Sequence, residues 1–174
     1  MKKIFKMLYL SLAFLCLLGI GANLEAGTYT IPPCAFTPLD YQRSTLTPWY
    51  AYPSELYVNG PVAYEAGFVA PLNLPNGVTI KKITIYFTDE RDAEFQEVIF
   101  WFKRVKLSTG VQEDFASGAT DELGSGAGRR SIVLTGSRLY SKTVNNNAYA
   151  YSIMLVFPGG CDSYVRLHEI AITY

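Results

Sequence analysis

Beyond residue 26, the apolar residues of this chain recur at every second position in short runs, and no run has the period of an amphipathic helix. The clearest run spans 149–157, where large apolar side chains alternate with mostly smaller ones. Successive side chains of a strand point to opposite faces, so such a run puts one face in a core and the other outside. Turn residues separate the runs. This pattern restricts the chain to an all-β fold.

The runs predict seven to nine strands, joined by turns and without helical crossovers, so the strands should pair antiparallel. We expect a two-sheet sandwich of jelly-roll type. An eight-stranded outer-membrane barrel is the alternative, because the size fits and the chain ends on Tyr174, but irregular strands and the lack of repeating aromatic girdles favour the sandwich. The expected strands beyond residue 63 are 64–70, 78–88, 95–107, 113–117, 131–135, 140–144, 149–157 and 164–174.

Some of these runs carry irregularities. The parity of the apolar residues switches near Lys81-Lys82, which predicts a bulge or a bend, and again near His168-Glu169, which predicts a bulge. The run 98–102 is apolar at every position, which fits either burial on both faces or one buried face with an exposed aromatic residue on the other. The segment 74–77, Leu-Pro-Asn-Gly, predicts a turn.

The first 26 residues have the layout of a secretory signal peptide. Lysines up to Lys6 precede an apolar run of about 14 residues, shorter than the ~20 that span a bilayer. Cleavage after Ala26 or Ala22 is expected, and an uncleaved anchor is the alternative. We therefore expect a signal peptide over 1–26, an extended Pro- and Tyr-rich segment with at most edge strands over 27–63, and a sandwich domain over 64–174. The mature protein would be secreted or periplasmic, or held at the cell surface, without a stable membrane span.

Two cysteines, Cys34 and Cys161, remain after the signal peptide is removed. An even pair in a secreted chain suggests one disulfide, which would tie the N-terminal segment to the turn before the last strand; two free thiols are the alternative. Removal of residues 1–26 also takes away three lysines and one glutamate, which leaves twelve basic and fourteen acidic residues. Because there is no basic excess to bind phosphates, nucleic acid is not an expected partner.

The segment from Phe68 to Ile80, which includes the turn at 74–77, resembles a recurring opening of uncharacterised secreted bacterial proteins. The acidic turn at 88–92, the Asn-rich turn into Tyr149-Ala150-Tyr151 and the C-terminal pattern at 170–174 are similar to the same family. The resemblance covers about residues 66–174 and leaves the first third unmatched. It implies a β-sandwich and no known activity, because its motifs are turn and core patterns.

Aromatic side chains crowd the segment 41–64, and Trp101 lies on the mid-chain strand. Exposed Trp and Tyr rings offer flat apolar faces with a polar rim, which suit a sugar ring or a protein partner. On this basis Trp49, Tyr50, Tyr52 and Trp101 are the predicted ligand-binding residues. The alternative is that the N-terminal segment packs its aromatic residues against one end of the sandwich.

No cofactor is expected, apart from a calcium alternative at Asp89 and Asp92 in the acidic turn. Nucleophilic catalysis lacks its usual parts, because His168 is the single histidine and no Gly-x-Ser-x-Gly elbow is present. Glycoside hydrolysis needs two carboxyl groups that flank a bond in a cleft, whereas here several acidic residues share one turn, 89–97.

We therefore expect a secreted, non-catalytic β-sandwich that binds a glycan or a protein. A structural subunit of an extracellular assembly is the alternative, in which the N-terminal segment would pair with a neighbour's exposed sheet edge. A glycoside hydrolase is the third class.

Overall fold

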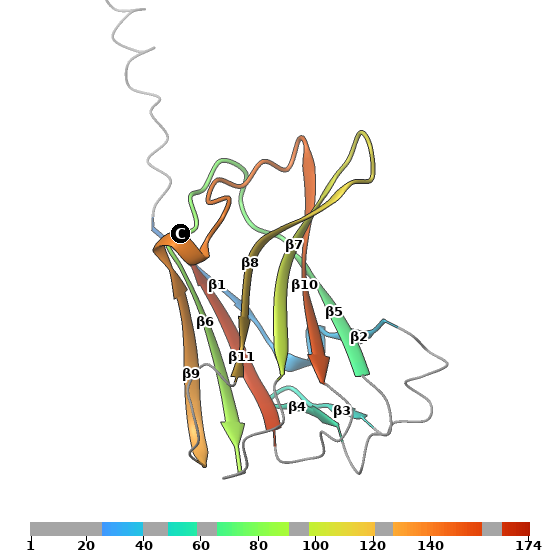
Figure 1. The fold of residues 1–174 in the computed structure, drawn as a ribbon, viewed down its shortest axis with the longest axis vertical. Helices are drawn as coiled ribbons and strands as arrows, with labels where there is room; N and C mark the ends of the chain where they lie inside the picture. Colours follow the sequence, from blue (N-terminus) through green and yellow to red (C-terminus); the bar gives the residue numbers. More distant parts are fainter. Residues whose placement is uncertain (1–25, 40–48, 59–65, 91–97, 121–126, 158–164) are drawn as a thin grey trace, which may run out of the picture.

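The computed structural model describes residues 26–39, 49–58, 66–90, 98–120, 127–157 and 165–174. Two antiparallel sheets pack face to face, which confirms the predicted all-β sandwich (Figure 1). The described residues form eleven strands and two short 3-10 helices: β1 (Thr28–Ile31), η1 (Pro33–Ala35), β2 (Thr37–Pro38), β3 (Trp49–Ala51), β4 (Leu56–Val58), β5 (Ala66–Leu72), β6 (Lys82–Asp89), β7 (Ile99–Lys106), β8 (Gln112–Ala119), β9 (Gly128–Thr135), η3 (Gly136–Arg138), β10 (Tyr149–Phe157) and β11 (Val165–Thr173).

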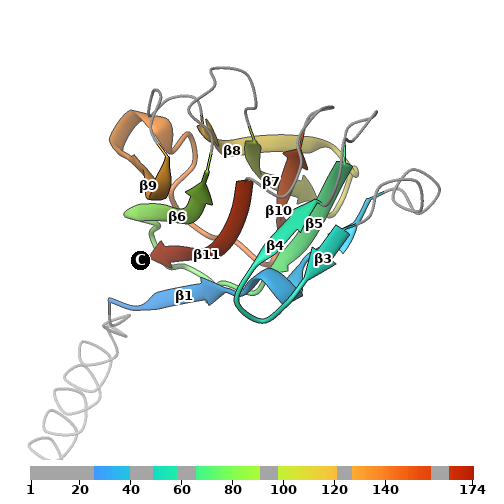
Figure 2. The ribbon, with the colours of Figure 1, turned by 90° about the horizontal axis from the view of Figure 1, so that it is seen from below.

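The first sheet, which we call sheet A, has the strand order β3-β4-β11-β6-β9, with β1 also paired to β11. Strands β1 and β4 share one edge of β11: β1 pairs along its C-terminal half, and β4 through Leu167 and Leu56 (Figure 2). The second sheet, sheet B, has the order β2-β5-β10-β7-β8. Strands β11 and β10 therefore form the centres of the two sheets.

The core lies between the sheets and is built from every second residue of the long strands. In β10 the buried and half-buried positions alternate from Tyr151 to Phe157, as the sequence predicts. Phenylalanines from both sheets fill the centre, and two edge-to-face ring pairs, Phe68–Phe157 and Phe102–Phe115, have centroid distances of 5.7 and 5.8 Å. The fully buried phenylalanines are Phe68, Phe87, Phe100, Phe102, Phe115 and Phe157.

Both predicted irregularities correspond to features of the structure. The pairing of β11 with β6 shifts register between Leu167 and Glu169, so the bulge at His168 is confirmed. Near Lys81 the chain changes partners: the Ile80 N–H donates to the Lys142 carbonyl at 2.7 Å, the Lys81 N–H donates to the Thr173 carbonyl at 2.8 Å, and the paired register with β11 and β9 starts at Lys82. The parity switch therefore marks the start of β6.

Two details differ from the sequence-based expectation. Strand β4 lies between β3 and β11 instead of at an edge, because β1 covers only half of the β11 edge and leaves room for it. The segment 140–144 forms one isolated bridge, Thr79 with Thr143, instead of a strand. The strand count exceeds nine because the segment before residue 59 contributes four strands of two to four residues each.

Most of the predicted signal peptide lies outside the described residues, of which Ala26 is the first, so the division of the chain at residue 26 stays a prediction. Within the described ranges, no helix has the length and apolar character needed to cross a bilayer.

The core packing gives the first prediction. Phe157→Ala removes a fully buried ring that packs edge-on against Phe68, so it should lower the free energy of unfolding by about 3–5 kcal/mol. Val133→Ala is the matched control, because Val133 is 46% exposed on β9, and should change it by less than about 0.5 kcal/mol. Urea unfolding measures both. Equal losses in the two variants would contradict the packing described.

Candidate functional site

Trp101 lies on the outer face of sheet B. Its neighbours on β7, Phe100 and Phe102, are buried in the core, so the alternation of the strand turns Trp101 outward. The indole is half-buried, and the register places Trp101 between Met154 on β10 and Ser117 on β8. Of the two readings of the run 98–102, the structure has one fully buried face with a partly exposed aromatic residue on the other.

A charged pair lies beside this ring. The Lys103 ammonium is 5.8 Å from the centroid of the Trp101 ring and donates to Asp114 Oδ1 at 2.7 Å. Asp114 stands opposite Lys103 because the pairing of β7 with β8 shifts register after Phe102, and the extra β8 residue is the buried Phe115. The Lys103 side chain is only 16% exposed, so the pair is partly desolvated.

Continuing across the sheet, Met154 pairs with Val69 on β5, and both are half-buried on the outer face. The result is a largely apolar surface with a polar, overall neutral edge. We call it the platform and define it by the outward side chains Val69, Trp101, Lys103, Asp114 and Met154.

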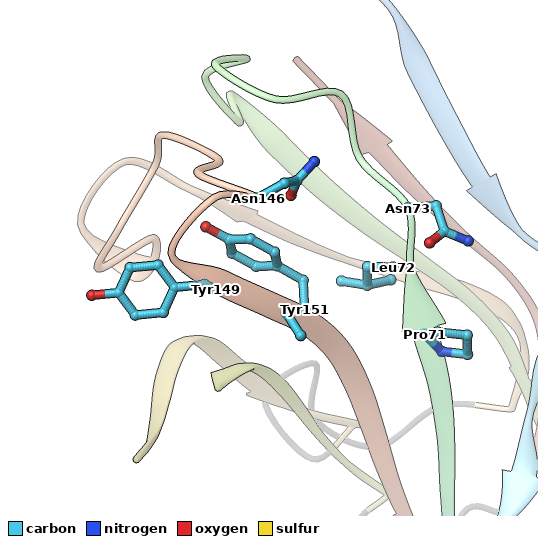
Figure 3. Close-up of a pocket in the computed structure, with 7 residues that line it drawn as sticks. Pro71, Leu72, Asn73, Asn146, Tyr149 and Tyr151 are labelled. Atoms are coloured by element: carbon cyan, nitrogen blue, oxygen red, sulfur yellow. The ribbon is translucent and has the colours of Figure 1, made fainter. Parts of the chain in front are cut away.

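A pocket of about 380 Å³ opens at the end of sheet B, where β5 and β10 separate (Figure 3). The last pair of β5 with β10 is Leu72 with Tyr151, whereas β10 goes on pairing with β7 as far as Tyr149. The residues of β5 lie on one side of the space, with β10 and the turn that precedes it on the other. We call this the end pocket; it is lined by Pro71, Leu72, Asn73, Asn146, Tyr149, Ala150 and Tyr151.

The wall of the end pocket is held by hydrogen bonds between two loops that are distant in sequence. Asn146 Nδ2 donates to the Leu74 carbonyl at 2.8 Å, and the Asn146 N–H donates to Asn76 Oδ1 at 2.8 Å. The Gly77 N–H donates to the Val144 carbonyl at 2.8 Å, and Gly77 has a φ of 82°, which a glycine adopts at low cost. These contacts fix the wall in one position.

The end pocket was not predicted, although both of its loops were recognised. Local sequence predicts the turn at 74–77 and the Asn-rich turn before Tyr149, and the structure brings the two together. The available signal was the unusual number of Asn residues in the two turns, since side-chain amides commonly bond to nearby backbone.

The platform and the end pocket are adjacent on sheet B. Ser152 pairs with Pro71, which lines the pocket, and with Lys103, which belongs to the platform. From Met154 to Ala150 is four residues of β10, or roughly 13 Å along the strand.

Three tyrosines gather on the outer face of sheet A, whereas the platform lies on sheet B. Tyr50 on β3 and Tyr57 on β4 are paired directly, with ring centroids 5.3 Å apart, and Tyr50 stacks on Tyr52 at 6.0 Å. Tyr50 and Tyr52 are 38% and 47% exposed. We call this group the tyrosine cluster.

The environment of Tyr57 within this cluster favours the neutral form of its phenol. Partial desolvation raises the pKa of Tyr57 above its usual value, and the neighbouring Tyr52, Glu55 and Tyr50 raise it further, while Arg166 lowers it. The Arg166 guanidinium lies 5.8 Å from the Tyr57 ring centroid and forms an ion pair with Glu55 at 3.8 Å.

The four predicted ligand-binding residues are therefore divided among three places. Tyr50 and Tyr52 share the tyrosine cluster, and Trp101 is the centre of the platform. Trp49 faces inward, where its ring meets Phe68 edge-on at 5.6 Å, as the core-packing alternative expects. Adjacent residues of one strand cannot share a face, which is why Trp49 and Tyr50 separate.

The remaining predicted sites are described only in part. Asp89 ends β6, while Asp92 lies outside the described residues, so the calcium alternative stays a prediction. Among the described residues no group of three His, Cys, Asp or Glu is placed to hold a metal ion. Cys34 is exposed in η1 and forms no disulfide with any described residue, and Cys161 lies outside the described ranges, so the disulfide also stays a prediction.

Both ring nitrogens of His168 are bound within the fold. Nδ1 lies 3.2 Å from the Ser54 carbonyl, which can only accept, so Nδ1 carries the proton in the neutral ring. Nε2 then accepts from the Thr88 hydroxyl at 2.6 Å. His168 connects the β3–β4 turn to β6 through the bulge of β11, which is a structural use of the ring.

The fold is shared with carbohydrate-binding modules. One similar structure is that of the CBM22-1–GH10 modules of endo-1,4-β-D-xylanase 10B from Clostridium thermocellum, complexed with xylohexaose, at 10% identity and a TM-score of 0.54; the match covers 85% of this chain and 27% of that one. Another is the CBM22-2 xylan-binding domain of Xyn10C from Paenibacillus barcinonensis, at 9% identity and a TM-score of 0.51. This match covers 84% of this chain and 99% of that domain. No family model and no curated protein matches the sequence.

The tyrosine cluster gives a second prediction. Because desolvation and neighbouring groups raise the pKa of Tyr57 above 10.0, Tyr57→Phe should remove one ionisation step above pH 10.0 from an absorbance titration of the folded protein. Tyr140→Phe, at a 68% exposed position, is the control and should leave the step in place. The stability that Tyr57 contributes is present below pH 10 and is lost as the pH rises through its folded-state pKa. An unchanged titration of Tyr57→Phe would contradict the arrangement.

Proposed function

We propose that this protein is a secreted, non-catalytic carbohydrate-binding module that holds a neutral glycan on the platform of sheet B. The observation that carries the proposal is the placement of Trp101 at the centre of that face, partly exposed and next to the partly desolvated Lys103–Asp114 pair. Nothing in the core packing requires an indole at an outward position.

The chemistry of the platform suits a sugar. The flat apolar ring of Trp101, with Met154 and Val69 beside it, can cover the C–H face of a pyranose. Lys103 and Asp114 lie at the edge of this surface, where sugar hydroxyls need donors and acceptors. Because the two charges compensate each other, the platform favours a neutral glycan over an anionic one.

The shared fold supports the same reading. A xylan-binding domain shares this fold, and so does the matched part of a xylanase module pair whose structure was determined with xylohexaose. At about 10% identity, their ligands serve here only to choose the first probe, which is xylan.

A non-catalytic role fits the chemistry of the described surface. Glycoside hydrolysis uses two carboxyl groups that face each other across the bond, and Asp114 is the single carboxylate of the platform, paired with Lys103. His168 is engaged by Thr88 and Ser54 on sheet A and is not presented to a substrate.

The proposal predicts a loss of binding when the ring is removed. Trp101→Ala should weaken the retardation of the protein by soluble xylan in affinity electrophoresis at least tenfold in association constant, or about 1.4 kcal/mol. Tyr50→Ala is the matched control, because it removes an exposed aromatic ring from sheet A, and should bind as the unchanged protein does. Wild-type affinity in Trp101→Ala, or failure of the protein to bind xylan and other neutral polysaccharides, would refute the proposal.

An assembly subunit is the alternative, with the tyrosine cluster as its contact surface. The cluster exposes two stacked tyrosine rings next to Arg166, and tyrosine and arginine are enriched at protein interfaces. Strand donation from the N-terminal segment has less support, because β1 to β4 all pair within the chain. Concentration-dependent oligomers that Tyr50→Ala abolishes would favour this alternative.

Secretion and the disulfide belong to the same proposal. The intact mass of the exported protein should correspond to loss of residues 1–22 or 1–26 and should rise by two hydrogens on reduction, because Cys34 and Cys161 are the cysteines that remain. Retention of the first 26 residues would contradict export as a cleaved protein, and a mass unchanged by reductant would contradict the bond.

A further inference from the structure

The end pocket differs from the platform in shape and in chemistry. Its volume, about 380 Å³, is near the lower end of the range for ligand pockets, which suits one ring-sized group. The lining contains no charged side chain: it consists of aliphatic residues, two tyrosines and two asparagines. A phosphate, a carboxylate or an ammonium group would find no opposite charge there, whereas a neutral polyhydroxylated ring needs none.

Polar groups of the lining are available to such a ring. The Asn73 side chain makes no hydrogen bond with any residue that the structure describes, and its backbone N–H is bonded to the Tyr29 hydroxyl. Asn146 uses its Nδ2 on the Leu74 carbonyl, which leaves its Oδ1 as an acceptor. Figure 3 shows Asn146 above the Tyr151 ring, with Asn73 and Leu72 across the space on the β5 side.

The aromatic part of the lining is held in place. The Arg104 guanidinium lies 4.2 Å from the centroid of the Tyr149 ring and is itself bonded to Glu113 and Ser141. The Tyr151 hydroxyl accepts from the Asn145 N–H at 2.9 Å. Binding would therefore cost little side-chain ordering.

The position of the pocket decides what part of a glycan it would take. Ser152 connects it to the platform, so a chain lying over Trp101 and running along β10 reaches Pro71 and Ala150. Beyond them it meets the loops joined by Asn146, Asn76 and Leu74, which close that end. A chain can enter from the platform but has no straight continuation past the wall.

We infer that the end pocket binds the terminal sugar of a neutral glycan whose inner units lie on the platform, so that the protein recognises chain ends. The inference rests on the proposed function, since the platform supplies the rest of the binding surface. Recognition of a chain end has a direct consequence for stoichiometry: the number of bound proteins follows the number of chains, whatever their length.

Calorimetric titration with xylohexaose and with soluble xylans of two known mean lengths tests the inference. The expected result is one protein per chain for all three ligands, and an affinity for xylose alone at least tenfold weaker than that for xylohexaose. A number of bound proteins that rises with chain length would overturn chain-end recognition while leaving the proposed function in place. Xylose binding as tightly as xylohexaose would also overturn it. No binding of any of these ligands would overturn the inference together with the proposed function.

A pair of variants tests the pocket itself. Asn73→Ala should weaken xylohexaose binding about three- to tenfold, the effect of one or two lost hydrogen bonds, without changing the melting temperature. Asn147→Ala is the matched control, because Asn147 is an exposed asparagine of the turn and does not line the pocket. Unchanged binding in Asn73→Ala, with Trp101→Ala still defective, would place the glycan on the platform alone and refute the end-pocket site.

Discussion

The burial of Phe100 and Phe102 between the two sheets is the constraint from which the rest of the site follows. Side chains of a strand alternate, so the residue between these two has to face outward, and that residue is Trp101. The same rule turns Met154 outward between two buried residues of β10, and the register sets it beside Trp101. The platform lies on the face of sheet B opposite the hydrophobic core, so the packing of the core fixes its position.

Two local departures from regular pairing turn this face into a site. The extra residue in β8, Phe115, goes into the core and brings Asp114 opposite Lys103, which gives the platform its neutralised polar edge. The early end of β5 at Leu72 opens the end pocket next to β10, which continues. Neither feature changes the order of the strands or the core of the sandwich.

The sequence allowed the regular parts to be predicted and left the irregular ones open. Strand β10 coincides with the expected run at 149–157 because strict alternation has one interpretation, and the His168 bulge was visible as a parity switch. The orientation of Trp101 was not decidable, since 98–102 is apolar throughout and only packing against the other sheet selects the inner face. The end pocket depends on hydrogen bonds between loops some seventy residues apart, such as Asn146 with Leu74; the Asn-rich composition of each turn indicates side-chain hydrogen bonds but does not say which distant loop accepts them.

The most direct test of the central claim uses the two tryptophans as internal probes. Trp49 packs edge-on against Phe68, whereas Trp101 lies on the platform, so the two indole N–H signals of a ¹⁵N–¹H spectrum report on separate places. Each can be assigned by comparison with Trp101→Phe. Titration with xylohexaose should shift the Trp101 signal in a saturable way and leave the Trp49 signal in place. Saturable binding that moves only Trp49, or neither indole, would show that the glycan binds elsewhere and would contradict the account.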